Sequence, residues 1–163
     1  MPYAFRPLAS IPATRWVNLL TDPEVHRHMP LGGADWTEDR AADWAAGKDR
    51  QWVENGFGPW AIEVDGRLAG WGGFQKEGAD VDLGLVLLPK FWGHGAALHA
   101  ALLDKGFGEL GFDSITILLP PSRPRLKSLP RLGYQPDGEI TYDGERFLKF
   151  RLQRGDWRSA TTR

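Results

Sequence analysis

Apolar and polar positions change their period in the middle of the chain. Over residues 81–88 apolar and polar residues alternate until the stretch becomes apolar on both faces, which predicts a strand. Pro89 ends this strand, because proline has no N–H to donate to a ladder. From Ala96 onward apolar residues recur every three or four positions, which predicts a helix; they are Leu98, Ala101, Leu102 and Phe107. Gly93 and Gly95 lie between the two elements and predict a tight turn.

A strand, a glycine turn and a helix in this order can bind an anion. Free N–H groups and the positive end of the helix dipole then face one point. The alternative is a plain turn, which is the commoner explanation of a short G-x-G. A Walker loop is excluded because no Lys-Ser or Lys-Thr follows the glycines, and a dinucleotide fingerprint is excluded because its third glycine is missing.

The remaining pattern predicts short strands on both sides of this stretch and helices mainly before it. Ser10 and Thr37 are predicted helix caps, the second for a helix that ends near Glu54 at Asn55-Gly56. Asp65-Gly66 is a strong hairpin signal. The predicted strands are 3–7, 60–64, 68–74, 114–119, 134–141 and 146–152, and further short helices are expected over 22–28 and 125–132. We expect a single domain over residues 1–163, with a frayed tail from about Arg154.

The segment D-L-G-L-V-L-L-P-K-F-W-G-H-G-A-A resembles the acyl-CoA-binding segment of the GNAT acetyltransferases. It is closest to the branch that includes the ribosomal-protein N-terminal acetyltransferases RimJ and RimL. Trp92, Gly95 and Ala97 occupy the positions of that family's R/Q-x-x-G-x-G/A loop, with Trp92 in place of Arg or Gln. R-L-G-Y at 131–134 and L-L-T-D-P-E-V-H-R-H-M-P near the N-terminus extend the resemblance over roughly residues 3–152.

The resemblance implies an α+β (mixed α/β) GNAT acyl-CoA N-acyltransferase fold, with about seven strands in a mixed sheet flanked by helices. The fourth and fifth strands, 81–88 and 114–119, would be splayed apart. It also implies where acetyl-CoA would bind. The pantetheine arm would meet the backbone of Val86, Leu87 and Leu88, and the pyrophosphate would meet the amides of Trp92, Gly93, His94, Gly95, Ala96 and Ala97.

Acetyl transfer to an amine needs a base, a donor to the oxyanion and a way for the thiolate to leave. Asp82 is the candidate base, because it stands where the RimJ/RimL-like branch often carries Glu. Asp80 lies on the same strand face, and a solvated acid is the alternative for both residues. The oxyanion donor would be the backbone N–H near Leu87.

The sequence departs from the family at the leaving-group acid. Leu129 stands where many members carry Tyr, while Ser122 and Arg125 replace the Asn and Ser of the RimL-like N-x-x-S pattern. Ser122 is a candidate partner of the pantetheine or the sulfur, and otherwise a loop cap. Arg125, like its basic neighbours Arg123 and Lys127, would contact CoA phosphates or lie on a solvated face.

Composition narrows the classes of function. With a net charge of −1, the protein has no overall positive field that would attract nucleic acid, and the absence of cysteine excludes disulfides and thiolate metal sites.

The four histidines are interpreted as ordinary surface residues rather than metal ligands, with His94 placed to meet phosphate; the others are His26, His28 and His99. Of eight tryptophans, three are candidate walls of an acceptor groove: Trp36, Trp60 and Trp92, although core packing is the safer interpretation of Trp60. No apolar run reaches 18 residues and no targeting segment is visible, so a cytoplasmic location without membrane contact is expected.

These observations favour an N-acetyltransferase that moves an acetyl group from acetyl-CoA to a primary amine, on a protein N-terminus or a small molecule. It would need no metal and no nucleic acid, and it could form a homodimer through exposed sheet edges. The first alternative is a non-catalytic acyl-CoA-binding module of the same fold. The second is a structural domain whose glycine turn binds nothing.

Overall fold

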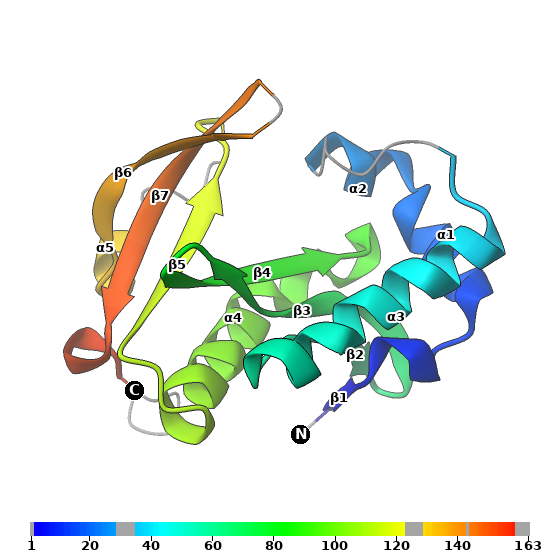
Figure 1. The fold of residues 1–163 in the computed structure, drawn as a ribbon, viewed down its shortest axis with the longest axis horizontal. Helices are drawn as coiled ribbons and strands as arrows, with labels where there is room; N and C mark the ends of the chain where they lie inside the picture. Colours follow the sequence, from blue (N-terminus) through cyan, green and yellow to red (C-terminus); the bar gives the residue numbers. More distant parts are fainter. Residues whose placement is uncertain (1, 29–34, 123–128, 143, 159–163) are drawn as a thin grey trace. The chain divides into compact units, whose positions relative to one another are not determined.

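Seven strands form a mixed sheet in the order β1-β2-β3-β4-β5-β7-β6 (Figure 1). The computed structural model describes residues 2–28, 35–122, 129–142 and 144–158. The strands β1 and β2, β2 and β3, β5 and β7, and β6 and β7 pair antiparallel, whereas β4 and β5 pair parallel. Their bounds are Tyr3–Arg6 (β1), Pro59–Val64 (β2), Arg67–Glu77 (β3), Asp80–Leu87 (β4), Ser114–Leu119 (β5), Gln135–Tyr142 (β6) and Glu145–Gln153 (β7).

Helices occupy the remaining regular segments. The α-helices are Ala13–Leu20 (α1), Pro23–His28 (α2), Glu38–Asn55 (α3), Gly95–Asp104 (α4) and Leu129–Leu132 (α5). A π turn at Lys105–Glu109 continues α4, and 3-10 turns lie at Leu8–Ser10, Pro89–His94 and Arg154–Asp156. The predicted mixed sheet with flanking helices is therefore confirmed, as is the order of its elements.

The chain divides into two compact units, and β3 and β4 each contribute to both. The first unit holds residues 1–73 and 85–96, and the second holds residues 74–84 and 97–163. The two units are described separately below. The expectation of a single domain over the whole chain stays a prediction.

Helix α3 organises the first unit and packs against α1, the 3-10 turn at Leu8–Ser10 and β2 (Figure 1). Its predicted caps are confirmed: Thr37 Oγ1 accepts the Arg40 N–H at 3.1 Å, and Gly56 is left-handed with φ 79°. The predicted cap at Ser10 is wrong. Helix α1 begins after Pro12 without a side-chain cap, and Ser10 Oγ donates to the Pro7 carbonyl at 2.7 Å.

The core of the first unit is rich in tryptophan. Trp16 is fully buried and its indole N–H donates to the Leu8 carbonyl at 2.9 Å. Leu8 and Ala9 in turn donate their backbone N–H groups to the Asp49 carboxylate at 2.8 and 2.9 Å, which ties this turn to α3. The predicted β2–β3 hairpin is confirmed, with Asp65 and Gly66 at φ 50° and 79°.

The second unit holds α4 from Ala97, the π turn, α5, the strands β5, β6 and β7, and the parts of β3 and β4 within residues 74–84. Of the apolar positions predicted for this helix, Leu98, Leu102 and Phe107 are buried and Ala101 is half-buried. Phe107 lies in the π turn, and Leu103, which the spacing did not predict, is buried as well.

Residues 154–158 make specific contacts within this unit, and the fraying expected from about Arg154, apart from Trp157, stays a prediction. Arg154 donates to the carbonyls of Phe107 and Phe112 at 2.7 and 3.1 Å, and the Trp157 ring lies 5.3 Å from the Phe107 ring.

Candidate active site

Asp82 lies on β4 directly opposite Thr116 of β5, at the described parallel register between the two strands. Thr116 is buried, and its hydroxyl donates to Asp82 Oδ1 at 2.8 Å. Burial raises the pKa of Asp82 to about 7, and the negative charges of Glu77 and Asp80 act in the same direction. The Thr116 hydrogen bond and the charge of Lys149 oppose this rise without cancelling it. Asp82 is therefore a half-buried carboxyl group that exchanges its proton near neutral pH.

Asp80 lies two residues earlier on β4 and has the opposite character. Its carboxylate binds Lys149 Nζ at 2.5 Å and Arg151 Nη2 at 2.9 Å. The hydrogen bond from Lys149 is the main reason why the pKa of Asp80 lies below its usual value. The strand periodicity places both acids on one face, but their protonation behaviour differs. Asp80 is a fixed ion-pair partner, whereas Asp82 can accept and release a proton.

The buried Tyr134 and the half-buried His99 form a hydrogen-bonded pair in the same unit. The Tyr134 hydroxyl lies 2.8 Å from His99 Nε2, and the two rings meet edge to face with centroids 5.7 Å apart. Burial, assisted by the charge of Asp82, raises the pKa of Tyr134 well above its ordinary value. Tyr134 therefore keeps its proton, and its hydroxyl group shares a hydrogen bond with His99 Nε2. The sequence interpretation missed this pair, because no local pattern links residues on α4 and after α5.

Two histidines expected at the surface are in fact hydrogen-bonded to tyrosines. His99 is one; the other is His94, whose Nδ1 lies 2.9 Å from the Tyr3 hydroxyl. Both imidazoles are half-buried, whereas His26 is exposed as expected. Within the described residues no three His, Cys, Asp or Glu side chains gather as a metal site would require.

The turn between β4 and α4 belongs to the first unit up to Ala96. It is a 3-10 turn at Pro89–His94, and Gly95 begins α4 with helical angles of φ −56° and ψ −47°. The tight turn expected at Gly93 and Gly95 is therefore present, and neither glycine is among those with positive φ. Pro89 lies at the first position of the 3-10 turn, which suits its fixed φ. Gly93, Ala96 and Ala97 are exposed, and Gly95 is buried.

Trp92 fixes the end of β4. It stands where the resemblance expects Arg or Gln, and its indole N–H donates to the Leu87 carbonyl at 2.8 Å. The Leu88 N–H donates to the Ala69 carbonyl at 2.8 Å. The Val86 carbonyl lies against Gly70, where an added Cβ would stand only 1.9 Å from it. Several backbone groups of residues 86–88 are therefore used within the protein.

The residues that the sequence analysis considered at the leaving-group end of the site are exposed, outside the described residues or buried in the core. Ser122 is exposed in a turn after β5. Arg125 and its neighbours Arg123 and Lys127 lie outside the described residues. Leu129 is only 4% exposed, so the position of the usual tyrosine is apolar core.

The three predicted groove tryptophans contact different partners. Trp36 lies against Trp44 with centroids 6.2 Å apart, Trp60 against Trp52 and Phe5, and Trp92 is 39% exposed. Core packing, the safer interpretation of Trp60, agrees with its two aromatic neighbours. No helix among the described residues is long and apolar enough to cross a membrane.

Comparisons with known proteins agree on one family. Residues 4–124 match the family model described as an acetyltransferase (GNAT) domain. An acetyltransferase from Agrobacterium tumefaciens str. C58 is similar at 21% identity with a TM-score of 0.72, over 93% of this chain and 90% of that one. A GNAT-family acetyltransferase from Bacillus anthracis is similar at 16% identity with a TM-score of 0.74, over 95% and 96%. At these identities the solved structures establish the fold, and the family model establishes the family.

Proposed function

Since the chain belongs to the GNAT acetyltransferase family, we propose that it transfers the acetyl group of acetyl-CoA to a primary amine. The observation that carries this proposal is the Asp82 carboxyl group with its pKa near 7. A base poised near the working pH is most effective, because it is both available and strong enough to take a proton. A membership of the RimJ/RimL-like branch, a cytoplasmic location and a homodimer stay predictions.

Asp82 acts in this proposal as the general base. An amine acceptor arrives as an ammonium ion, which has no lone pair for attack. The Asp82 carboxylate accepts one ammonium proton, and the neutral nitrogen then forms the bond to the thioester carbonyl carbon. The C–S bond breaks, the thiolate leaves as CoA, and the second nitrogen proton passes to solvent as the amide forms.

The backbone after Asp82 supplies the donors. The Leu87 N–H is the proposed donor to the oxyanion, and the Trp92 indole binds the carbonyl of the same residue, in the next peptide group. The turn and first helical residues from Trp92 to Ala97 are the proposed pyrophosphate contacts, because the amino end of α4, which is the positive end of its dipole, lies there. Ser122 and Arg125 remain proposed contacts of the pantetheine and phosphates.

One observation favours a second candidate function. The buried, apolar Leu129 offers no hydroxyl to protonate the departing thiolate. A non-catalytic acyl-CoA-binding module would tolerate this change. A thiolate is, however, a stable leaving group that water can protonate, so we rank catalysis first.

Two measurements test the proposal. The first is acetyl-CoA consumption in the presence of amines and peptides, and no turnover above background with any acceptor would leave the binding module as the better function. The second is the melting temperature with and without CoA, because a ligand that binds only the native state stabilises it.

A matched pair of variants locates the CoA site. Gly95→Glu should abolish the CoA-induced rise in melting temperature, since it places a carboxylate at the buried start of α4. Gly155→Glu adds the same charge at an exposed position with no atom near the new Cβ, so it should retain the rise. An undiminished rise in Gly95→Glu would show that the phosphates bind elsewhere.

A further inference from the structure

A buried threonine contacts the proposed base from the neighbouring strand. Thr116 lies on β5 at the register position of Asp82 on β4, and both residues belong to the second unit. On its other side Thr116 pairs with Arg151 of β7, so two ladders hold its backbone. Only 1% of Thr116 is exposed, and its branched side chain has few allowed rotamers. The hydroxyl group is therefore fixed beside the Asp82 carboxyl group.

The Thr116 hydroxyl lies between two acceptors. It is 2.8 Å from Asp82 Oδ1 and 3.3 Å from the Val81 carbonyl oxygen. A hydroxyl group has one proton to donate, and a charged acceptor makes the shorter and stronger hydrogen bond. The bond to a neutral Asp82 is weaker, and the Val81 carbonyl then competes for the proton. The hydroxyl group therefore favours the ionised form of Asp82 over the neutral form.

The two side-chain oxygens of Asp82 have different surroundings. Oδ1 accepts from Thr116, whereas no group in the part of the chain that the structure describes donates to Oδ2. Asp82 is half-buried, so its carboxyl group is still accessible from solvent. Oδ2 is therefore the oxygen that is left to exchange a proton.

Thr116 has the largest effect among the groups that favour the charge of Asp82. Burial is the main cause of the raised pKa of Asp82, and the Thr116 hydrogen bond is the main effect that opposes it. The other titratable groups that interact with Asp82 are Glu77 on β3, Asp80 on β4, Lys149 on β7 and Tyr134 after α5. The two acids raise its pKa further and the ammonium group of Lys149 lowers it, while Tyr134 stays neutral.

We infer that Thr116 is a positioning residue of the proposed acetyl transfer: its hydroxyl group holds Asp82 Oδ1 against β5 and leaves Oδ2 to accept the ammonium proton. This inference rests on the proposed function. The ammonium proton forms its new bond to Oδ2, and the electron pair of the broken N–H bond becomes the lone pair that attacks the thioester carbon. Oδ1 remains an acceptor when Oδ2 carries the proton, so the carboxyl group keeps its orientation through the transfer.

Carbon NMR titrates the Asp82 carboxyl group directly, in the protein without CoA or an amine. In the wild type the midpoint should lie at a pH of about 7. Thr116→Val removes the hydroxyl group from a side chain of nearly the same shape. It should raise the midpoint by about one pH unit, because a charge-assisted hydrogen bond is about twice as strong as a neutral one. Thr116→Ser keeps the hydroxyl group and should titrate like the wild type. An unchanged midpoint in a folded Thr116→Val protein would overturn the inference.

A matched control removes a different hydroxyl group from the same strand. Ser114 lies two residues before Thr116 on β5, and its hydroxyl accepts from Arg151 Nη1 at 2.8 Å. Ser114→Ala should therefore leave the Asp82 midpoint in place. A rise as large as that in Thr116→Val would show that any disturbance of β5 moves the titration, and it would overturn the specific role of Thr116.

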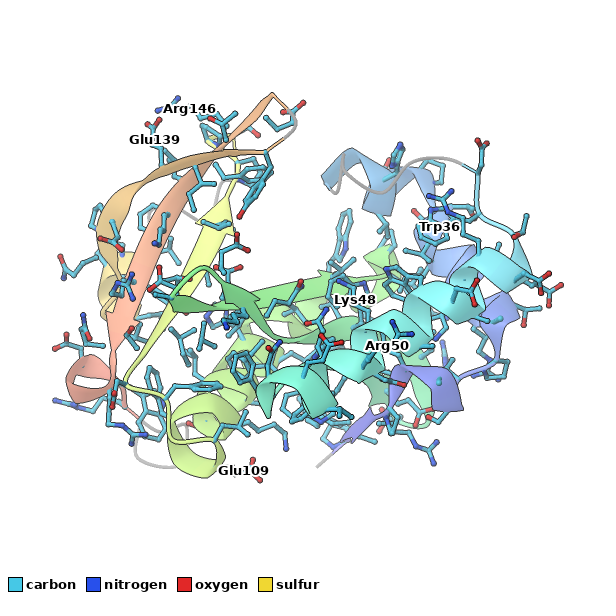
Figure 2. All side chains as sticks on the ribbon, viewed as in Figure 1. Trp36, Lys48, Arg50, Glu109, Glu139 and Arg146 are labelled. Carbon is cyan, nitrogen blue, oxygen red and sulfur yellow. The ribbon has the colours of Figure 1, made fainter. Side chains whose placement is uncertain are left out.

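The wild type alone gives a further test that does not depend on a variant folding. The Thr116 Cβ resonance should move with the same midpoint as the Asp82 carboxyl carbon, because the two side chains share a hydrogen bond. Glu139, which Arg146 binds across the β6–β7 hairpin (Figure 2), is the internal reference, since this ion pair keeps its pKa below the usual value. A Thr116 resonance that does not follow the Asp82 titration would overturn the inference.

The pH dependence of catalysis separates positioning from a structural role. A midpoint one pH unit higher lowers the ionised fraction at pH 7 from about one half to about one tenth, so kcat/KM of Thr116→Val should fall about fivefold. This part of the loss should vanish above about pH 9, and KM for acetyl-CoA should change less than twofold. A structural defect alone would lower the rate equally at every pH.

The same measurements distinguish this inference from the proposed function. Turnover of amines by Thr116→Val with the pH profile of the wild type would keep acetyl transfer and overturn the positioning role. An Asp82 titration that depends on Thr116, in a protein that turns over no amine, would support the hydroxyl contact and overturn the proposed function.

Discussion

Replacing Asp82 by Asn tests the proposed base, because it changes the proton chemistry and little else. Asn has the same shape, and its side-chain oxygen can still accept the Thr116 hydroxyl that now lies 2.8 Å from Asp82 Oδ1. What disappears is the ability to titrate. The same variant therefore reports on stability and on catalysis.

The effect on stability follows from the raised pKa. In the native state Asp82 holds its proton up to a pH of about 7, whereas in the unfolded chain it ionises near 3.8. Between these values the unfolded state binds fewer protons, so stability falls as the pH rises and is constant above about pH 7. At 1.36 kcal/mol per pKa unit, the whole loss is at most about 4 kcal/mol. Asp82→Asn avoids this loss, so its stability relative to the wild type should rise by up to that amount between pH 4 and pH 8.

Denaturant unfolding at several pH values measures this difference. Asp80→Asn is the control, because the pKa of Asp80 is lowered by Lys149 and Arg151 and its stabilisation is present above the unfolded pKa. Asp80→Asn should therefore be less stable than the wild type at neutral pH, and this deficit should shrink in acid. A stability difference for Asp82→Asn that stays constant from pH 4 to pH 8 would refute the buried, near-neutral carboxyl.

Catalysis gives the second readout. Loss of a general base lowers turnover about a hundredfold to ten-thousandfold. Asp82→Asn should do so at pH 7 and leave CoA affinity unchanged, and the defect should shrink at high pH where the amine is already neutral. In the wild type, kcat/KM should rise with pH through about 7. Full turnover by Asp82→Asn at neutral pH would show that Asp82 is not the general base.

Three further substitutions have outcomes that the packing fixes. The Gly70→Ala protein should be unfolded or strongly destabilised in thermal melts, because the new Cβ would lie 1.9 Å from the Val86 carbonyl oxygen, a backbone atom that cannot move away. A melting temperature within a few degrees of wild type would contradict the close approach of β3 and β4. Tyr134→Phe should cost about 1–3 kcal/mol in denaturant unfolding, since it leaves the half-buried His99 Nε2 without its hydroxyl partner, and a neutral effect would show that water replaces it. Thr37→Ala should cost about 1 kcal/mol by removing the cap of α3, whereas Thr37→Ser should be nearly silent.

The fold was predictable where the signals are local. The strand predicted at 81–88, observed at Asp80–Leu87, the cap at Thr37 and the Asp65-Gly66 hairpin each depend on a few neighbouring residues, and all three are confirmed. The tight turn expected at Gly93 and Gly95 is present as well, as a 3-10 turn. Ser10 failed as a cap because Pro12 already provides the extended residue before α1.

The chemistry of the candidate site could be predicted only in part. Asp82 was identified through its resemblance to a family position, but its pKa depends on burial and on Thr116, 34 residues away. The His99–Tyr134 and Tyr3–His94 pairs span 35 and 91 residues. Long-range contacts decide which polar residues are paired, and periodicity does not report them.

The π turn at the end of α4 bears on how chain length varied during evolution. The Leu110 N–H donates to the Lys105 carbonyl at 2.9 Å, five residues back, so this turn holds one residue more than an α-helical turn. Deleting one residue here would restore α-helical bonding and rotate the following side chains by about 100°. A larger neighbouring residue would then occupy the position of Gly106. Any Cβ at that position lies 2.7 Å from Ile115 Cδ1 and Phe74 Cζ. A related chain that is one residue shorter at this point would therefore need compensating changes around Ile115 and Phe74. In an alignment with such a chain, the one-residue gap belongs within residues 105–109 rather than in the loop that follows.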